Sequence, residues 1–176
     1  KIGHRDPALA THPSAMSDAA PFLARVPGIQ YGVLDTLTGY AVRRTQLRMY
    51  EDFVQALAPW HITPPRYSAL VIISLNPGLK LTQLAQILGI ARSGAVILVD
   101  ALADLGYVSR DPMPEDRRAF SLQLTDRGRA DLETITATVQ AHDERVTASL
   151  DPQERATLHG LLHKLSGITD GPGGPL

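Results

Sequence analysis

The chain is 176 residues long, a length that suits one domain with a sizeable core and room for long helical arms. Its formal net charge of −1 argues against a protein that coats nucleic acid regardless of sequence, but it permits positive charge gathered on one face. The absence of cysteine excludes a disulfide scaffold, a thiol-based redox sensor and a cysteine-ligated metal or cluster.

Residues 1–30 are rich in alanine, proline, serine and histidine and keep no sustained period, so we expect a flexible arm. Phe22, Leu23 and Val26 suggest that part of this arm docks, with a partner subunit as one candidate surface.

A long helix over residues 31–58 is predicted by an apolar face at helical spacing, and Pro59 ends it. Thr63 followed by proline predicts the capped start of a second helix. Residues 67–75 are almost wholly apolar, so this helix should be buried on most sides. The sequence Asn76-Pro77-Gly78 is typical of a turn.

A helix-turn-helix is predicted next. Residues 79–88 form a short helix that Thr82 can cap, and Gly89 and Ile90 make the turn. A second helix runs to about Leu105 and ends at Gly106, a residue that tolerates positive φ. The apolar stripe of this second helix recurs at steps of four and three: Ala91, Ala95, Leu98, Leu102 and Leu105.

A β-hairpin with a polar, basic tip follows. Tyr107 and Val108 begin one strand, and the alternation of Phe120, Leu122 and Leu124 with polar residues predicts its partner. The tip between the strands, residues 110–118, is too hydrophilic for a core. A helix-turn-helix followed by such a hairpin is a shape that docks on a DNA duplex.

Two further helices close the chain. Thr125 should cap the first, and Asp151, Pro152 and Glu154 form the capped start of the second. Residues 169–176 read as a flexible tail. The predicted helices at 31–58 and 125–168 carry more apolar surface than a small winged unit can cover, which favours packing on a second copy.

The chain resembles the MarR family of bacterial transcription regulators. The resemblance is carried by residues 105–110, by Asp116-Arg117-Arg118 and by residues 122–128, which contain Leu-Thr-x-x-Gly. It implies a mainly α fold with a small β-hairpin wing, in which one domain over residues 31–168 combines a winged helix-turn-helix lobe, residues 64–124, with long dimerisation helices.

The same resemblance implies function. It predicts a homodimer that binds a palindromic double-stranded DNA operator, and a repressor released by a small aromatic acid or an acyl-CoA thioester. The alternative is a winged-helix module that serves protein interaction without DNA binding, and the apolar Val96 and Ile97 are its best support.

The predicted DNA-binding residues lie on the helix-turn-helix and the hairpin tip. The resemblance pairs Asp116 with Arg118, whose guanidinium would enter a minor groove. Val96 and Ile97 either contact thymine methyl groups or pack inside the lobe or against the wing. Asp100 should have an arginine partner from the wing or a neighbouring helix. The full set is Thr82, Gln83, Arg92, Ser93, Val96, Ile97, Arg110, Asp116, Arg117 and Arg118.

An effector site is predicted where aromatic side chains and arginines occur together, because arginine can hold a carboxylate in bidentate fashion. The alternative is that these arginines form surface or dimer ion pairs and that Trp60 fills a helix corner. His142 falls on an apolar helix face, which predicts a core or pocket residue bonded through one nitrogen. The candidates are Tyr40, Arg43, Arg44, Trp60, His61, Arg66, Tyr67 and His142.

No catalytic motif or phosphate-binding glycine loop is found, so we expect neither an enzyme nor a cofactor. His159 and His163 lie one helical turn apart, but a zinc site would need a third ligand, and we expect a solvated face with no metal. No apolar run has the length of a membrane span and no signal-peptide core is found, so we expect no membrane association and a cytoplasmic protein.

Overall fold

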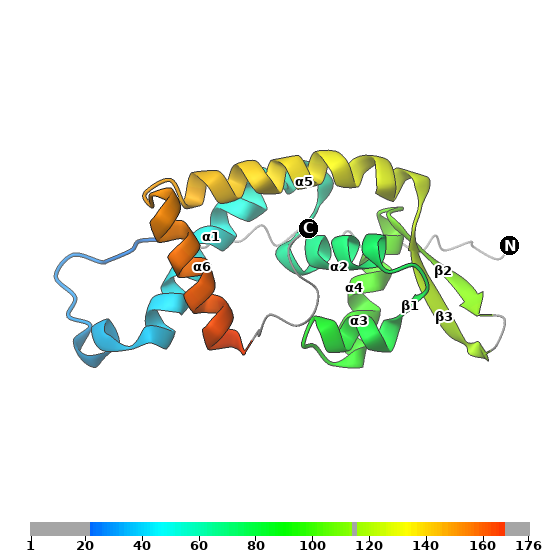
Figure 1. Ribbon diagram of the computed structural model, residues 1–176, viewed down its shortest axis with the longest axis horizontal. Coiled ribbons are helices and arrows are strands. Elements are labelled where there is room, and N and C mark those ends of the chain that lie inside the picture. The colour runs from blue at the N-terminus through cyan, green and yellow to red at the C-terminus, as the bar shows by residue number, and fades with distance from the viewer. Residues whose placement is uncertain (1–21, 114–115, 168–176) are drawn as a thin grey trace, which may run out of the picture.

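The computed structural model describes residues 22–113 and 116–167. In Figure 1 two groups of elements are joined by one long helix, α5, along the top. The elements in chain order are η1 Gly32–Thr36, α1 Thr38–Ala56, η2 Ala58–Trp60, α2 Pro64–Leu75, β1 Leu79–Lys80, α3 Leu81–Ile87, α4 Arg92–Asp104, β2 Val108–Met113, β3 Asp116–Leu124, α5 Asp126–Val146 and α6 Pro152–Ser166.

One group holds η1, α1 and α6, and the other is a lobe of α2, α3, α4 and the three strands (Figure 1). The sheet is antiparallel with strand order β1-β3-β2. β2 and β3 form the hairpin, and β1 pairs with the other edge of β3. The mainly helical fold with a small hairpin is therefore confirmed.

The core lies in the lobe and against the middle of α5. Ala95, Val99 and Leu102 bury one face of α4, while Ile135 is fully buried on α5. The buried cluster also includes Phe53, Leu57, Ile62, Ala69, Leu70, Ile73, Leu79, Leu84, Tyr107, Val108, Leu122 and Leu124.

The long first helix predicted for residues 31–58 is wrong at its start. Residues 32–36 form a separate 3-10 helix, because Leu37 adopts an extended conformation with ψ 117° and breaks the hydrogen-bond ladder. Thr36 donates its hydroxyl to the carbonyl of Val33 (2.9 Å), a local bond that competes with continuing the helix.

The start of the helix-turn-helix also differs from the prediction. Leu79 and Lys80 form β1, paired with Leu122 and Ser121, instead of the first turn of a helix. Thr82 is not the cap, because it lies inside α3. The N-terminus is instead held by Gln83, whose side-chain oxygen accepts the Lys80 N–H at 2.9 Å.

Other local predictions hold with small corrections. α2 begins at Pro64 as predicted, although Thr63 makes no side-chain capping bond. Burial along α2 ends before Leu75, which is exposed. On α4, Ala91 lies outside the helix and is exposed, so Val99 replaces it in the buried face.

Part of the predicted flexible arm packs on α1 of the same chain. The Phe22 N–H donates to Glu51 (3.3 Å), and the Arg44 guanidinium donates to the carbonyls of Leu23 and Ala24. Residues 1–21 and the tail predicted at 169–176 lie outside the described residues.

Candidate nucleic-acid interface

Helices α3 and α4 form the helix-turn-helix, with a bend of 108° between them. Gly89 makes the turn at φ +63°, a conformation that suits glycine. The Ile90 N–H reaches back to the Ala85 carbonyl (3.0 Å) and the Gly89 N–H to that of Gln86 (3.2 Å), the bond pattern of a Schellman C-cap. This local bonding fixes the direction in which α4 leaves the turn.

The face of α4 opposite the core carries Arg92, Ser93, Ile97 and Asp100, all of them exposed. Ile97 has 70% of its surface exposed, and Val96 beside it is half-buried. The interpretation that Ile97 packs within the lobe is therefore wrong for the single chain, since the buried face lies on the other side of the helix. Thr82 and Gln83 on α3 are also exposed.

Asp100 has the arginine partner that the sequence predicts. The Arg110 guanidinium, from β2, donates to the Asp100 carboxylate, and both side chains keep partial exposure. The pair ties the hairpin to α4. It also neutralises an acid that would otherwise repel a phosphate on this face.

The hairpin extends beyond the lobe (Figure 1). Its strands pair from Val108 opposite Leu124 to Pro112 opposite Phe120, and a register shift follows before Met113 pairs with Asp116. The backbones of Asp116, Arg117 and Arg118 begin β3. Their side chains lie outside the described part of the structure, so the predicted pose of Arg118 stays a prediction.

The Leu-Thr-x-x-Gly sequence forms the junction between the hairpin and α5. Thr125 caps α5 by accepting the Gly128 N–H (2.9 Å), and its own hydroxyl donates to the Gly106 carbonyl (2.6 Å). The Thr125 N–H donates to the Tyr107 carbonyl (3.0 Å). The predicted cap is confirmed, and it anchors the wing to the long helix.

Tyr107 lies at this junction, buried in the core, and is 2% exposed. Arg127 lies over its ring, 5.2 Å from the ring centre. Burial, with a smaller contribution from the charge of Asp131, raises the pKa of the Tyr107 phenol, so the ring stays neutral and apolar beneath α5.

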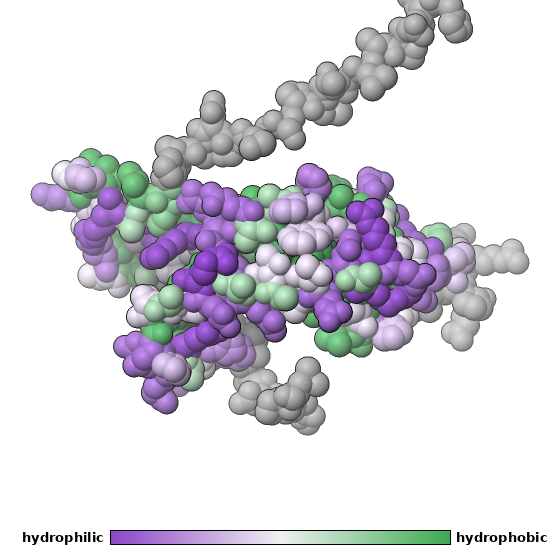
Figure 2. Space-filling model, turned by 90° about the horizontal axis from the view of Figure 1, so that it is seen from above, coloured by the Kyte–Doolittle hydropathy of each residue, from purple (hydrophilic) through white to green (hydrophobic). Residues whose placement is uncertain are grey.

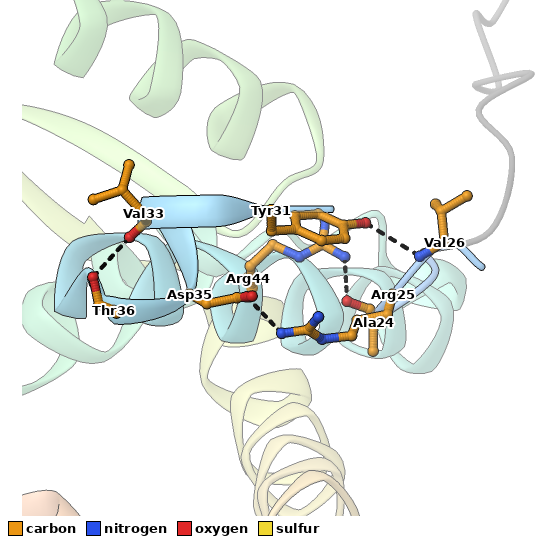
Figure 3. A network of polar contacts seen from close by, with 8 residues as sticks. All are labelled: Ala24, Arg25, Val26, Tyr31, Val33, Asp35, Thr36 and Arg44. Carbon is orange, nitrogen blue, oxygen red and sulfur yellow. Dashed lines mark hydrogen bonds and ion pairs between the residues drawn. The ribbon is translucent and has the colours of Figure 1, made fainter. Parts of the chain in front are cut away.

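The residues predicted to hold an effector fall into separate places. Tyr40 and Arg44, at the start of α1, border a cavity of about 180 Å³ whose other walls include Arg25, Tyr31 and Asp35. Figure 3 shows the side chains of Arg25, Tyr31, Asp35 and Arg44 close together. Arg25 donates to Asp35 (2.5 Å), and the Tyr31 hydroxyl accepts the Val26 N–H (3.1 Å).

Arg44 is the most connected of this group. Its guanidinium lies 4.3 Å from the ring centre of Phe22 and 6.0 Å from that of Tyr40. Arg43 is directed to Gln46 instead (2.7 Å). Sequence reasoning did not include Arg25 and Tyr31 in the site, because it placed Arg25 in an arm and Tyr31 at the start of one continuous helix. Phe22 indicated that the arm docks, and following it to α1 would have brought both residues to the cavity.

A second place is the corner between α1 and α2. His61 adopts a left-handed conformation with φ 54°, and its carbonyl accepts a bond from Arg66 (2.6 Å). Trp60 packs, half-buried, against the core, which agrees with the interpretation that it fills the corner. The Tyr67 ring centre lies 6.5 Å from that of Phe53.

His142 lies at a third place, between α5 and α1. It is 5% exposed, and its Nδ1 donates to Oδ1 of Asp52 (2.6 Å), which confirms a buried histidine bonded through one nitrogen. Arg145 donates to the same oxygen (2.7 Å). The hydrogen bonds from Arg145 and then His142 hold the pKa of the Asp52 carboxyl below its ordinary value.

The sequence predicts neither a metal site nor a membrane span. Within residues 22–113 and 116–167, no three metal-binding side chains gather at one point, and the rings of His159 and His163 lie 4.2 Å apart. In the same ranges no single helix has the length and apolarity of a membrane span; α3 and α4 together meet the criterion only as a bent pair.

Comparison with known proteins gives consistent results. The model of the MarR family matches residues 62–120. A protein of Thauera aromatica, whose name assigns it the regulation of the hcr operon, is 35% identical over 128 residues, covering 72% of this chain and 77% of that protein.

Two solved structures of the transcriptional repressor CouR are also similar. The one bound to a 23-mer DNA duplex is 39% identical with a TM-score of 0.75, covering 78% of this chain and 98% of that chain. The one bound to p-coumaroyl-CoA is 37% identical with a TM-score of 0.73, covering 78% and 97%.

These relatives are regulators and repressors of transcription, which favours a DNA-binding regulator over the protein-interaction module. The exposed face of α4, the hairpin beside it and the Leu-Thr-x-x-Gly junction agree with that assignment. The chain belongs to the MarR family of DNA-binding transcription regulators, and it is not an enzyme.

Proposed function

We propose that the protein is a homodimeric transcription repressor that binds a palindromic operator in double-stranded DNA and is released by an aromatic acid or its CoA thioester. The observation that carries the DNA-binding part is the exposed face of α4, set by the 108° bend from α3 and flanked by the hairpin. Because such a regulator must meet the chromosome, we place it in the bacterial cytoplasm.

α4 would lie in the major groove. Arg92 and Ser93 stand at its N-terminus, where no side chain among those described caps the helix, so backbone N–H groups and a cation are available to a phosphate. Arg110, oriented by Asp100, would contact the backbone at the other end of this face. Thr82 and Gln83 at the start of α3 would contact the flanking backbone.

The wing would read the adjacent minor groove. Asp116, Arg117 and Arg118 occupy the far end of the hairpin, where Asp116 pairs with Met113. An arginine at such a tip is attracted most strongly by a narrow A·T-rich groove, because a narrow groove concentrates negative potential.

The dimer would form through apolar side chains that stay exposed in one described chain, on α6 and at the N-terminal end of the molecule. α6 buries none of its residues, and its apolar face holds Leu158, Leu161, Leu162 and Leu165, which are 41–66% exposed. η1, α1 and the residue between them add Val33 (69%), Tyr50 (46%) and Leu37 (47%). Figure 2 shows hydrophobic residues at the end of the molecule where η1 lies.

Covering the exposed half of each leucine would contribute about 1 kcal/mol, half of what full burial contributes. A second copy offers the same apolar face and would bury all of this surface at once. Two lobes would then be held about one helical turn of DNA apart, the spacing that a palindromic operator requires.

The effector part of the proposal is supported by the CouR structure with p-coumaroyl-CoA and by the aromatic and cationic side chains of this chain. Tyr40 and Arg44 beside their cavity are the first candidates, followed by Arg43, by the corner of Trp60, His61, Arg66 and Tyr67, and by His142. Arginine beside an aromatic wall suits an anionic aromatic ligand.

The central experiment selects duplexes from a random pool with the full chain and measures their affinity against salt by fluorescence anisotropy. Each protomer carries one Arg118, whose charge in the groove neutralises one phosphate. The dimer of Arg118→Ala should therefore lose about 1.8 from the log–log salt slope, at about 0.9 for each phosphate no longer neutralised. Arg155→Ala, which removes an arginine on α6, is the control. Failure to select any duplex would contradict the proposed function.

A second measurement tests release. p-Coumaroyl-CoA, p-coumarate and CoA are added separately to the protein bound to its selected duplex. We expect the aromatic acid or its thioester to lower the anisotropy, and CoA alone to leave it unchanged. If neither an aromatic acid nor its thioester dissociates the complex with the operator, the effector part of the proposal is contradicted and the repressor part stands.

A further inference from the structure

Ile97 is a large apolar side chain with 70% of its surface exposed, at the centre of the α4 face that carries Arg92 and Ser93. Ser93 lies one helical turn before it. Asp100 lies one turn after it and is already bonded to Arg110. The centre of this face therefore offers a side chain that can neither donate nor accept a hydrogen bond.

A base edge that faces such a side chain must itself be apolar, because covering a donor or acceptor without pairing it is unfavourable. The major groove exposes one apolar group in unmodified DNA, the 5-methyl of thymine. A guanine or cytosine edge opposite Ile97 would lose its hydrogen bonds to water and gain none.

We propose that Ile97 is a specificity-determining residue, which contacts the thymine 5-methyl group at two symmetric positions of the operator. This inference rests on the proposed function, because it requires α4 to enter the major groove. Arg92 before Ile97 and Arg110 after it provide cations on both sides, which suits a side chain held against bases between two phosphate backbones. Val96, half-buried next to Ile97, extends the apolar contact.

The test removes single methyl groups from the DNA. In a duplex selected from a random pool, each thymine is replaced in turn by deoxyuridine, which lacks only the 5-methyl. At the two symmetric positions, each replacement should raise the Kd of the wild-type protein about fourfold, and both together about 15-fold, the effect expected for one buried methyl(ene) at each site. Deoxyuridine at thymines outside the contact should change little.

The Ile97→Ala variant completes a double-mutant cycle, in which one change is made in the protein and the other in the DNA. It should bind the thymine duplex more weakly and no longer distinguish thymine from deoxyuridine at those two positions. Ile87→Ala, which removes another exposed isoleucine (56%) at the end of α3, should keep the distinction. Because Ile97 is exposed, its variant should fold, and circular dichroism and dimer mass check this.

The outcomes distinguish a failure of the role of Ile97 from a failure of the proposed function. If the wild-type protein binds the selected duplex but no deoxyuridine weakens it, or if Ile97→Ala keeps the full methyl effect, the role of Ile97 is overturned and the repressor assignment stands. If no duplex is selected, the proposed function is overturned and this inference with it.

Discussion

Gly128 is the residue whose replacement most directly tests how the wing is joined to α5. A Cβ added there would lie 2.1 Å from the Tyr107 carbonyl oxygen and 3.0 Å from its carbonyl carbon. Both are backbone atoms of a residue held in the sheet junction, so neither can rotate away. Gly128→Ala should therefore force α5 and β2 apart.

The magnitude follows from three contributions. Overpacking in a well-packed site costs about 1–3 kcal/mol. Separation of the two elements also strains the hydrogen bond from the Thr125 N–H to the Tyr107 carbonyl. Loss of this hydrogen bond costs about 1 kcal/mol. The better helix propensity of alanine returns up to about 1 kcal/mol. We expect a net loss of about 2 kcal/mol, which lowers Tm by roughly 4–8 °C for a chain of this size.

Gly94→Ala is the matched control, since its Cβ would meet only the Ile90 side chain at 3.8 Å, an ordinary contact. This variant should gain about 0.5–1 kcal/mol. Urea unfolding at one fixed protein concentration measures both variants, because the stability of a dimer depends on concentration. A Gly128→Ala protein as stable as Gly94→Ala would refute the close approach of α5 to Tyr107.

Two further predictions concern the helices outside the lobe. The folded-state pKa of Asp52 lies below its unfolded value, so the carboxylate stabilises the fold above about pH 4 and loses that contribution as the pH falls. Asp52→Asn should flatten the acid side of the stability profile by about 1 kcal/mol or less, since the carboxylate is partly exposed, and an unchanged profile would contradict this. Asp151 caps α6 through the Glu154 N–H (2.8 Å), so Asp151→Ala should weaken each α6 by about 1 kcal/mol. Because the proposed dimer contains two copies of α6, its Kd in sedimentation experiments should rise by up to about 30-fold, whereas Gln153→Ala should leave the Kd unchanged.

Features set by a few neighbouring residues could be predicted from the sequence. Thr125 and Asp151 were identified as caps, because capping needs only a side-chain oxygen and an N–H three residues later. The pairing of Asp100 with an arginine followed from its position on a face that should approach phosphates. The burial of His142 could be predicted from helical periodicity alone, because the period places it on the apolar face of its helix.

Features set by distant partners could not be predicted. β1 has two residues and exists only because Leu122 and Ser121, about forty positions later, pair with it. The apolar Phe22 and Leu23 indicated that part of the arm docks, but the sequence did not indicate where. The docking surface is α1 of the same chain, and it depends on Arg44, which periodicity assigns only to a helix face. The effector candidates are of similar residue types, but they lie apart in space. Tyr40 is near the start of α1 and Trp60 lies beyond its end, so about 24 Å of helix, at 1.5 Å per residue, runs from Tyr40 to Ala56.

The three attachments of α5 explain how contacts in one chain would set the spacing of two lobes. At its N-terminus the cap by Thr125 and the absence of a side chain at Gly128 hold it against the hairpin. Ile135 anchors its middle in the core of the lobe, and His142 with Arg145 binds Asp52 on α1 near its C-terminus. Since α5 is one continuous helix across both groups (Figure 1), a change in the angle at the α1 end would move the wing at the other end. An effector bound beside α1 could thus act on DNA binding without touching α4, by changing the separation at which the two wings are held.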